Sequence, residues 1–419
     1  MGDSCLVMRS VWLGAGFRDG WPLPDRRGWA SGSLRQVLRP TASTYNTDVQ
    51  LSPDQHEAFL AIGWRDDLPA APACANASAG RLARVVEQHR AGYRVAIGEA
   101  VLKVSAPAEW LQPRFDPVDR AAVGDWVLLD DHDVITTVLP RHSLLKRGAA
   151  GEHYRQQLIA ANIDTVFVVS GLDGDFNPRR LQRYLLLVFG SADEGDRAQP
   201  VIVLTKADKA LEGEQADPNM AARVEQLRES LPDVPVLCVN AKSPDTVAAL
   251  APWLSKGQSV VLVGSSGAGK STLTNTLLGI EKQATQSVRE ADSRGRHTTT
   301  SRSLMRLPDG ACLIDTPGMR ELKLTGDERL EDAGFEDIEQ LATQCRFRDC
   351  RHQNEPGCAI QQSIKDGELQ AERWGSYQTL QGELSDAAQT LKVRQEQKRD
   401  ERVQSRAMNK RLTDKYGRR

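Results

Sequence analysis

The sequence lacks a long apolar segment, and its cysteines do not form a disulfide pattern. No run approaches the roughly 18 apolar residues of a membrane-spanning helix, so we expect no contact with a membrane. A secretory signal is not expected either, because charged residues at Arg9, Arg18 and Asp19 interrupt each short apolar run near the start. Of the seven cysteines, three lie close together and four are scattered, at Cys5, Cys74, Cys238 and Cys312. Such cysteine usage is typical of a reducing compartment, so we expect a cytoplasmic protein.

An excess of charge of one sign is also missing. The chain has 54 Lys and Arg against 56 Asp and Glu, a formal net charge of −2, so its total charge neither favours nor excludes a polyanionic partner. Local charge is less even, because residues 391–419 hold eleven basic and four acidic residues. No glycine lies between Gly382 and Gly417. We expect a basic helical tail at 386–419, which is either a solvated surface or an arm that attracts RNA phosphates.

A complete phosphate-loop pattern, GxxxxGK[ST], lies in the second half of the chain. It follows an apolar run at 259–263 and reads Gly264-Ser265-Ser266-Gly267-Ala268-Gly269-Lys270-Ser271-Thr272. The glycines let successive backbone N–H groups point into one concavity, Lys270 can reach the β- and γ-phosphates, and Ser271 is placed to bind Mg²⁺. The alternative is a glycine-rich turn without a ligand. The full match, between a strand and a helix, favours a nucleoside triphosphate site.

Around this loop, residues 151–334 alternate buried strands with helices, which predicts a doubly wound α/β domain. The expected helices occupy 178–189, 221–231 and 269–278. The near-continuous apolar runs typical of parallel strands covered on both faces are found at 165–169, 200–204, 234–239, 259–263 and 311–314. Ligands of this fold bind beyond the carboxyl ends of the strands, so we expect the nucleotide there.

Three further motifs follow the ends of these strands. The first, Thr205-Lys206-Ala207-Asp208, offers a carboxylate that can accept hydrogen bonds from the N1–H and amino group of guanine. The second, Asn240-Ala241-Lys242, can supply a backbone N–H to the guanine O6. The third, Asp315-Thr316-Pro317-Gly318, offers a carboxylate for the Mg²⁺ shell and a glycine N–H for the γ-phosphate. A solvated turn is the alternative for Lys206 and Asp208 taken alone, but the set predicts a GTP site.

The segment upstream, 80–150, has the pattern of short strands without helices between them. Short strands are expected at 83–86, 93–97, 100–104, 126–129 and 134–138, which fits a small closed barrel of OB type. Such barrels often carry oligonucleotides, although a purely structural role is the alternative. The basic stretch at 141–147 favours nucleic acid. Before the barrel, residues 1–79 read as a poorly ordered extension and a short helix. The extension is expected at 1–44, where its tryptophans could instead bind a partner, the helix at 52–64 and a linker at 65–80.

A cluster of metal-ligand residues follows the α/β domain. After a helix expected at 335–343, the pattern Cx4CxHx5C places three thiolates and one imidazole within fourteen residues, at Cys345, Cys350, His352 and Cys358. This is the inventory of a closed, structural Zn²⁺ site with one ion per chain, in a module at 335–385. Arg346, Arg348 and Arg351 around Phe347 give it a basic surface on which bases can stack.

These motifs resemble those of translation-factor-type GTPases, but in circularly permuted order, since the base-recognition motifs precede the phosphate loop. With the barrel and the metal cluster, residues 80–385 resemble the RsgA family of small ribosomal subunit biogenesis GTPases. The resemblance implies GTP hydrolysis, late assembly of the small ribosomal subunit, contacts to rRNA, hydrolysis stimulated by the ribosome and release after hydrolysis. We expect a monomer. A regulatory GTPase that binds another RNA or a protein is the alternative, and a binding module that senses nucleotide with negligible turnover is a third.

The resemblance also assigns roles to residues near the loop. The segment 294–300 matches the mobile switch, so one of Thr298, Thr299 and Thr300 should join Ser271 on Mg²⁺. Met319 stands where Ras-like GTPases place a water-orienting glutamine, which leaves His297 as the catalytic candidate beside Lys270; contact with nucleic acid or solvent is the alternative for His297. Thr205 stands where the family usually has Asn, so we expect lower nucleotide affinity with guanine preference kept.

Overall fold

The computed structural model describes residues 53–416, except for short gaps at 78–79, 90–91, 113–114, 149–155, 191–197, 212–216, 281–301, 317–322, 327 and 331–332. All described residues belong to one compact unit, 47–419. Three of the predictions above lie outside the described residues: the extension at 1–44, the switch segment with His297 and Thr298 to Thr300, and the end of the third motif, Pro317 to Met319.

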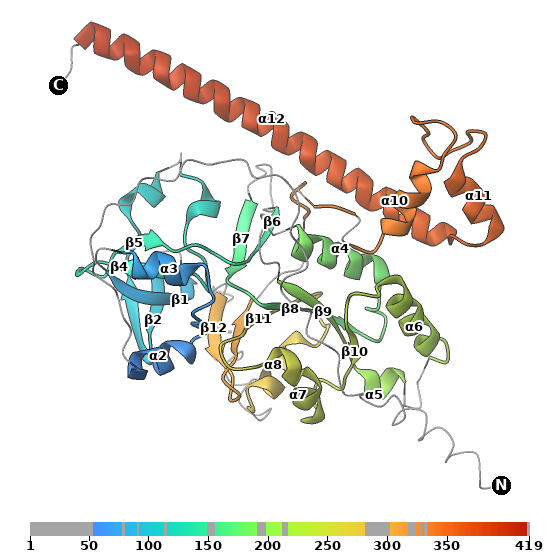
Figure 1. Cartoon of the computed structure of the whole chain (residues 1–419), viewed down its shortest axis with the longest axis horizontal. Helices are drawn as coiled ribbons and strands as arrows, with labels where there is room; N and C mark the ends of the chain where they lie inside the picture. The colour runs from blue at the N-terminus through green and yellow to red at the C-terminus, as the bar shows by residue number, and fades with distance from the viewer. Residues whose placement is uncertain are drawn as a thin grey trace, which may run out of the picture. The chain divides into compact units, whose positions relative to one another are not determined.

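A parallel sheet forms the centre of the α/β part of the molecule (Figure 1). Its strands lie in the order β10 (Val236–Cys238), β9 (Gln199–Thr205), β8 (Thr165–Gly171), β11 (Ser259–Gly264) and β13 (Cys312–Asp315), and all four neighbouring pairs are parallel. These are the five strands expected from the apolar runs. The next strand, β12 (Arg302–Arg306), pairs antiparallel with β13 and was not predicted.

Helices cover both faces of this sheet, because alternate strand residues point to opposite sides. Val166 and Val168 join the core that contains residues of α4 (Pro178–Phe189) and α6 (Met220–Ser230), while Phe167 and Val169 join the core that contains residues of α7 (Asp245–Leu250) and α8 (Lys270–Leu277). Two short helices, α5 (Ala207–Ala210) and η3 (Ala251–Trp253), complete this part. The doubly wound arrangement is therefore confirmed.

A second group of strands extends the same sheet beyond β12. Its members β1 (Arg81–His89), β2 (Gly92–Ile97), β3 (Ala100–Val104), β4 (Trp126–Leu129) and β5 (Ile135–Val138) pair antiparallel in the order β3, β2, β1, β4, β5. A parallel bridge between Ser105 and Val134 links the first strand of this row to the last. The short helices η1 (Ala108–Leu111) and η2 (Pro117–Asp119) lie between β3 and β4, and Trp110 of η1 packs into the apolar centre of the group.

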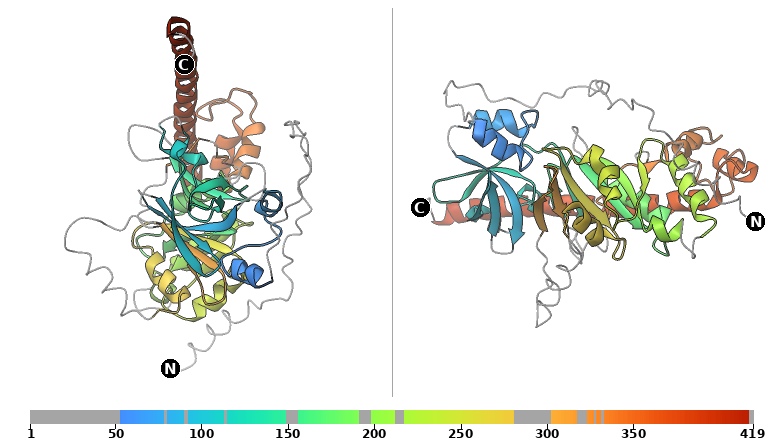
Figure 2. Two further views of the ribbon diagram at one scale, coloured as in Figure 1. Left: turned by 90° about the vertical axis from the view of Figure 1, so that its left-hand side faces the viewer. Right: turned by 90° about the horizontal axis from the view of Figure 1, so that it is seen from below.

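A helix is present within 52–64, as expected, and the segment 65–80, expected to be a linker, also contains a helix. Helices α2 (Pro53–Leu60) and α3 (Ala70–Ala75) lie beside the strands just described, as Figure 2 shows. The rings of Phe59 and Trp64 lie 6.2 and 4.8 Å from that of Trp126. Leu68, Ala70 and Cys74 are buried as well, so the segment after Trp64 is packed although its Asp, Pro and Ala content is typical of a linker.

The basic stretch 141–147 exposes less charge than its sequence suggests. The Arg141 guanidinium is ion-paired at 2.8 Å with Asp125, whose side chain is fully buried. Lys146 is 8 % exposed and lies on β6 (Leu144–Gly148), which pairs with β7 (Gln156–Ala161) in a separate two-stranded sheet that was not predicted. Much of the charge of this stretch is therefore paired or buried inside the fold, so it no longer favours nucleic acid at strands β1 to β5.

The C-terminal part is helical. Helices α10 (Glu336–Thr343) and α11 (Ala359–Asp366) precede α12 (Ala371–Tyr416), which continues without a break across the boundary expected between 385 and 386. Trp374, Tyr377 and Leu380 on its first turns are buried. No helix in the described ranges is long and apolar enough to cross a membrane.

Candidate nucleotide site and metal centre

The phosphate loop begins where β11 ends, beside the last residues of β8. Gly264 has φ of 148°, and a Cβ there would lie 2.1 Å from the carbonyl oxygen of Val169. Gly267 and Gly269 also have positive φ, of 86° and 93°. A residue with a side chain could not adopt this path without strain, so the three glycines allow the loop to fold back before α8 begins at Lys270.

The Lys270 ammonium group lies over its own loop. Its Nζ donates to the carbonyl oxygens of Gly264, at 2.7 Å, and Ser265, at 2.5 Å. Burial lowers the pKa of Lys270, and the nearby carboxylates of Asp175 and Asp315 act in the opposite direction. The cation is thus held where phosphates bound by the loop would meet it.

Thr205 connects the first base-recognition motif to the phosphate loop. It is the last residue of β9, fully buried, and its hydroxyl donates to the carbonyl oxygen of Ala268 at 2.6 Å. The next residue, Lys206, adopts a left-handed backbone with φ of 64°, which starts the short helix α5 with Asp208 in its first turn. Asp208 is half-buried at the same edge of the sheet. The end of β9, the Thr205 hydroxyl and the turn at Lys206 together place this motif beside the phosphate loop.

The second base-recognition motif follows β10 and contacts both neighbouring segments. Its Lys242 N–H donates to the side chain of Asn240 at 3.1 Å, so that N–H is already used. The Ala241 carbonyl oxygen accepts a hydrogen bond of 2.6 Å from the Thr276 hydroxyl on α8. The Ala207 N–H donates to the carbonyl oxygen of Val239 at 3.3 Å, and this hydrogen bond joins the two motifs. The second motif is therefore tied both to the first motif and to α8.

The third motif begins at the end of β13, the strand next to β11. Asp315 is the last residue of β13, and the buried Thr316 hydroxyl donates to the carbonyl oxygen of Leu262 at 3.1 Å. Since β11 and β13 are parallel neighbours, Asp315 lies at the same edge as Ser271. The structure therefore brings the described members of all four motifs to one edge of the sheet.

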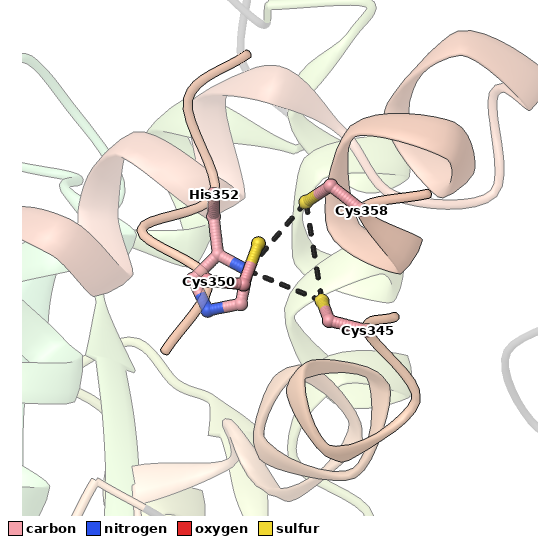
Figure 3. Close-up of side chains that lie close together, drawn as sticks. All are labelled: Cys345, Cys350, His352 and Cys358. Carbon is pink, nitrogen blue, oxygen red and sulfur yellow. Dashed lines mark hydrogen bonds between the residues drawn. The ribbon is translucent and has the colours of Figure 1, made fainter. Parts of the chain in front are cut away.

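The four predicted metal ligands also meet (Figure 3). One ligand atom from each of Cys345, Cys350, His352 and Cys358 lies within 4.8 Å of the others. His352 Nδ1 is 3.4 Å from the Cys345 sulfur and 3.5 Å from the Cys358 sulfur, and the two sulfurs are 4.0 Å apart. Ligands about 2.0–2.3 Å from a central tetrahedral ion would have such separations. The cluster could hold a metal ion.

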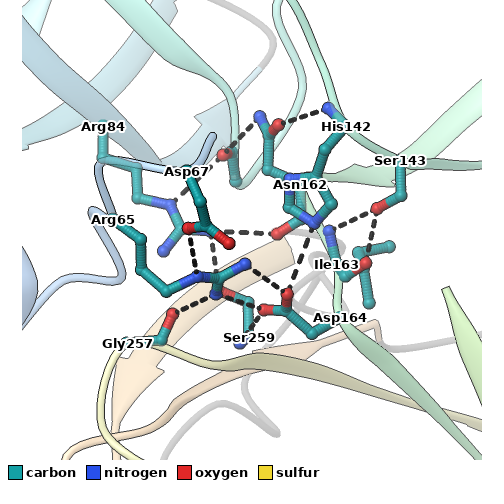
Figure 4. Close-up of polar contacts among 11 residues, drawn as sticks. Arg65, Asp67, Arg84, His142, Ser143, Asn162, Ile163, Asp164, Gly257 and Ser259 are labelled. Atoms are coloured by element: carbon teal, nitrogen blue, oxygen red, sulfur yellow. Dashed lines mark hydrogen bonds and ion pairs between the residues drawn. The ribbon is translucent and has the colours of Figure 1, made fainter. Parts of the chain in front are cut away.

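A polar network that no sequence pattern indicated lies where strands β1 to β5 meet the α/β part (Figure 4). Arg84 is fully buried without a carboxylate partner, and it donates to acceptors from three segments: the carbonyl oxygens of Ile62 and Gly124, and the hydroxyl of Ser259. Beside it, Arg65 pairs with Asp164 at 2.8 Å. Arg84 shares a face of β1 with the buried Leu82 and Val86, and the segments packed on that face supply the acceptors that an arginine needs there.

A phosphate loop that follows its base-recognition motifs, on a sheet of this strand order, defines a circularly permuted P-loop GTPase. The family model for the RsgA GTPase matches residues 138–325. A second model, for the ABC transporter, matches residues 250–410, and both matches include the phosphate loop, which many nucleotide-binding families share. A solved structure, the crystal structure of YjeQ from Thermotoga maritima, is 24% identical, covers 73% of this chain and 99% of its own, and has a TM-score of 0.51, which supports the fold.

Curated relatives are much more similar in sequence. The small ribosomal subunit biogenesis GTPase RsgA of Xanthomonas axonopodis pv. citri is 59% identical over 313 residues, which cover 74% of this chain and 83% of the relative. The protein of the same name from Xanthomonas campestris pv. campestris (strain B100) is 58% identical over the same shares. The chain belongs to the RsgA GTPase family, and it is a GTP hydrolase.

Proposed function

We propose that this GTPase acts in the biogenesis of the small ribosomal subunit, as the names of its relatives state for them. The observation that carries the proposal is the identity of 59% to such a GTPase, with the described nucleotide motifs at one sheet edge. The ribosomal subunit binds the GTP form and stimulates hydrolysis, and hydrolysis promotes release. The protein works as a cytoplasmic monomer.

The nucleotide contacts follow from the edge of the sheet. Asp208 reads the guanine N1–H and amino group, with Thr205, Lys206 and Ala207 shaping its turn, and the Ala241 N–H, between Asn240 and Lys242, meets the guanine O6. The backbone of the loop, Gly264 to Thr272, cradles the phosphates with Lys270. Mg²⁺ is held by Ser271, with Asp315 in its shell and one of Thr298 to Thr300 from the switch. His297 positions the attacking water, and Gly318 contacts the γ-phosphate.

Structural Zn²⁺, one per chain, fits the cluster at Cys345, Cys350, His352 and Cys358. The donor set of three sulfurs and one ring nitrogen is that of a closed site, which stabilises the surrounding loops rather than performing chemistry. The loop carries Phe347, 42 % exposed, with the Arg346 guanidinium 5.6 Å from the ring centre. This surface suits contacts with rRNA.

The proposed domain order is the one expected from the sequence. We propose an OB-type barrel at 80–150, supported by the row of paired strands that the Ser105–Val134 bridge links end to end. The permuted GTPase domain at 151–334, the zinc module at 335–385 and the basic tail at 386–419 follow it, and the segment 1–79 precedes it. Because the stretch 141–147 uses its charge internally, rRNA contacts fall mainly to the zinc module and the tail.

The test is GTP hydrolysis by the full chain with and without purified small ribosomal subunits, combined with co-sedimentation in GTP and in GDP. We expect slow hydrolysis alone, acceleration by orders of magnitude with subunits, and co-sedimentation in GTP but not in GDP. Absence of both binding and stimulation at low salt would overturn the ribosomal proposal and leave a regulatory GTPase for another partner. Lys270→Ala, which should abolish hydrolysis in either case, checks the nucleotide site separately.

A further inference from the structure

Two aspartates outside the recognised motifs lie between the first base-recognition motif and the phosphate loop. Asp173 and Asp175 belong to the segment between β8 and α4, at the carboxyl edge of the sheet. The Asp173 carboxylate accepts a hydrogen bond from the ammonium group of Lys206 at 2.5 Å. The Asp175 carboxylate accepts one from the Ser265 hydroxyl, also at 2.5 Å. The segment therefore contacts both halves of the nucleotide site.

The two aspartates are also connected to each other. The Asp175 N–H donates to the Asp173 carboxylate at 3.0 Å, and the Gly171 N–H donates to the Asp175 carboxylate at 3.5 Å. These contacts fix the segment between β8 and α4 locally. A continuous series of polar contacts then runs from Lys206 through both aspartates to Ser265.

Arg180 compensates the charge at the phosphate end of this series. Its guanidinium lies 2.5 Å from the Asp175 carboxylate and also donates to the Asp175 carbonyl oxygen. The Asp175 side chain is 18 % exposed. An uncompensated carboxylate beside a polyphosphate would repel it, whereas an ion-paired one can hold the loop without that repulsion.

We propose that Asp173 and Asp175 are positioning residues, which hold Lys206 and the phosphate loop at a fixed separation so that one nucleotide engages both. The inference rests on the nucleotide site given under Proposed function. Neither aspartate needs to touch the nucleotide, because Asp173 acts through Lys206 and Asp175 acts through Ser265. A site that is already arranged loses less conformational freedom when its ligand binds, so the contacts raise affinity.

The test is a double-mutant cycle on GDP affinity, measured on the full chain by titration with a fluorescent GDP. Asp175→Ala should weaken binding about tenfold, since hydrogen bonds to charged groups are among the stronger ones. Asp175→Asn keeps an acceptor for the Ser265 hydroxyl and should retain most of the affinity. In a Ser265→Ala background, Asp175→Ala should add only about a twofold loss, because the contact is already gone. The pair Asp173→Ala and Lys206→Ala should be non-additive in the same way.

The control is Glu225→Gln, the same loss of one carboxylate charge in an exposed pair with Arg228 on α6, which should leave GDP affinity unchanged. Wild-type affinity in Asp175→Ala, or additive effects in the cycles, would overturn the proposal. If Asp175→Ala folds poorly, Ser265→Ala removes the same hydrogen bond from the other side and must weaken GDP binding for the proposal to stand. Unchanged affinity in Lys270→Ala would instead refute the nucleotide site itself.

Discussion

Thr205 stands where the RsgA family usually has asparagine, and the structure shows what its hydroxyl does. Its hydroxyl reaches the Ala268 carbonyl oxygen at 2.6 Å, inside the phosphate loop, with no exposed surface. One short donor thus joins the base end of the site to the phosphate end, where an asparagine could make further hydrogen bonds. Lower nucleotide affinity stays a prediction. Guanine preference should be unchanged, because Asp208 and Ala241 lie elsewhere on the edge of the sheet.

Removal of the Thr205 hydroxyl checks directly whether it supports nucleotide binding. Thr205→Val keeps the shape of the side chain but leaves the Ala268 carbonyl oxygen without its donor, which costs about 1 kcal/mol. We expect GDP and GTP affinities about fivefold lower, with guanine still preferred over adenine. Titration of both nucleotides and of ATP measures the effect. Affinities equal to those of the wild type would show that this hydroxyl does not support the site.

The pair between Arg65 and Asp164 predicts a pH dependence of stability. Burial alone would raise the pKa of Asp164, but the His142 ring, 3.5 Å from the carboxylate, and the hydrogen bonds and charge of Arg65 hold it well below its usual range. A lowered folded-state pKa means that the pair stabilises the fold fully above the unfolded pKa of about 4, and that this stability is lost as the pH falls below that value.

Asp164→Asn should therefore lower the free energy of unfolding by about 3 kcal/mol at pH 7, because it removes the largely buried partner of Arg65 and leaves the guanidinium paired only with the exposed Asp67. Urea unfolding of wild type and variant at pH 7 and at pH 3 measures this difference, which should shrink at the lower pH. A difference that is the same at both pH values would contradict the assignment. Asp67→Asn, at the exposed partner of Arg65, is the matched control and should have a small effect.

At the scale of elements, the segment with α2 and α3 packs closely against β1 at Gly63. Gly63 has φ of 92°, and a Cβ there would lie 1.9 Å from Nη1 of the buried Arg84. Gly63→Ala should destabilise the protein by about 2–4 kcal/mol, from backbone strain and from displacement of Arg84. Gly382→Ala on α12, where a Cβ would meet nothing within 4 Å, should be neutral or slightly stabilising. Thermal unfolding of both variants measures these effects. Equal stability of Gly63→Ala and the wild type would contradict the close packing of Gly63 against Arg84.

The metal cluster connects α10 and α11 through one loop. Cys358 is both a candidate ligand and the residue before α11, where its sulfur accepts from the Gln361 N–H at 3.5 Å. Cys358→Ala should lose the metal and unfold this module, because structural zinc contributes folding free energy directly. Metal analysis of protein purified without chelator should give one zinc per wild-type chain. A wild type without zinc would refute the site, and Ser363→Ala on α11 is a control that should keep the metal.

Much of this architecture could be predicted from the sequence, and the exceptions have physical reasons. Strands β8, β9 and β11 are covered on both faces and therefore read as continuous apolar runs. Strands β6, β7 and β12 mix buried and polar positions, and α3 contains Pro72 in a linker-like composition, so no local pattern marked them. Arg84 and Asp175 depend on partners from distant segments, which only the folded chain brings together.

At the scale of the whole molecule, the first part of α12 is packed. Among the residues whose burial the structure describes, the buried ones of α12 all precede residue 391, where the basic excess begins: Trp374, Ser376, Tyr377, Leu380 and Ala387. The ion pair between Arg183 of α4 and Glu383 joins this packed part to the GTPase core. A cut after residue 390 should therefore leave the described core intact and remove mainly charge.

Removal of residues 391–419 takes away eleven basic and four acidic residues, a net loss of seven positive charges. If the tail contacts rRNA, the truncated protein should bind small subunits more weakly, and its binding should fall less steeply with salt, because fewer counterions are released. Basal GTP hydrolysis and thermal stability should stay unchanged. Co-sedimentation at several salt concentrations measures the slope. A truncated protein with the wild-type slope would show that the tail is a solvated surface, and that the zinc module carries the rRNA contact without it.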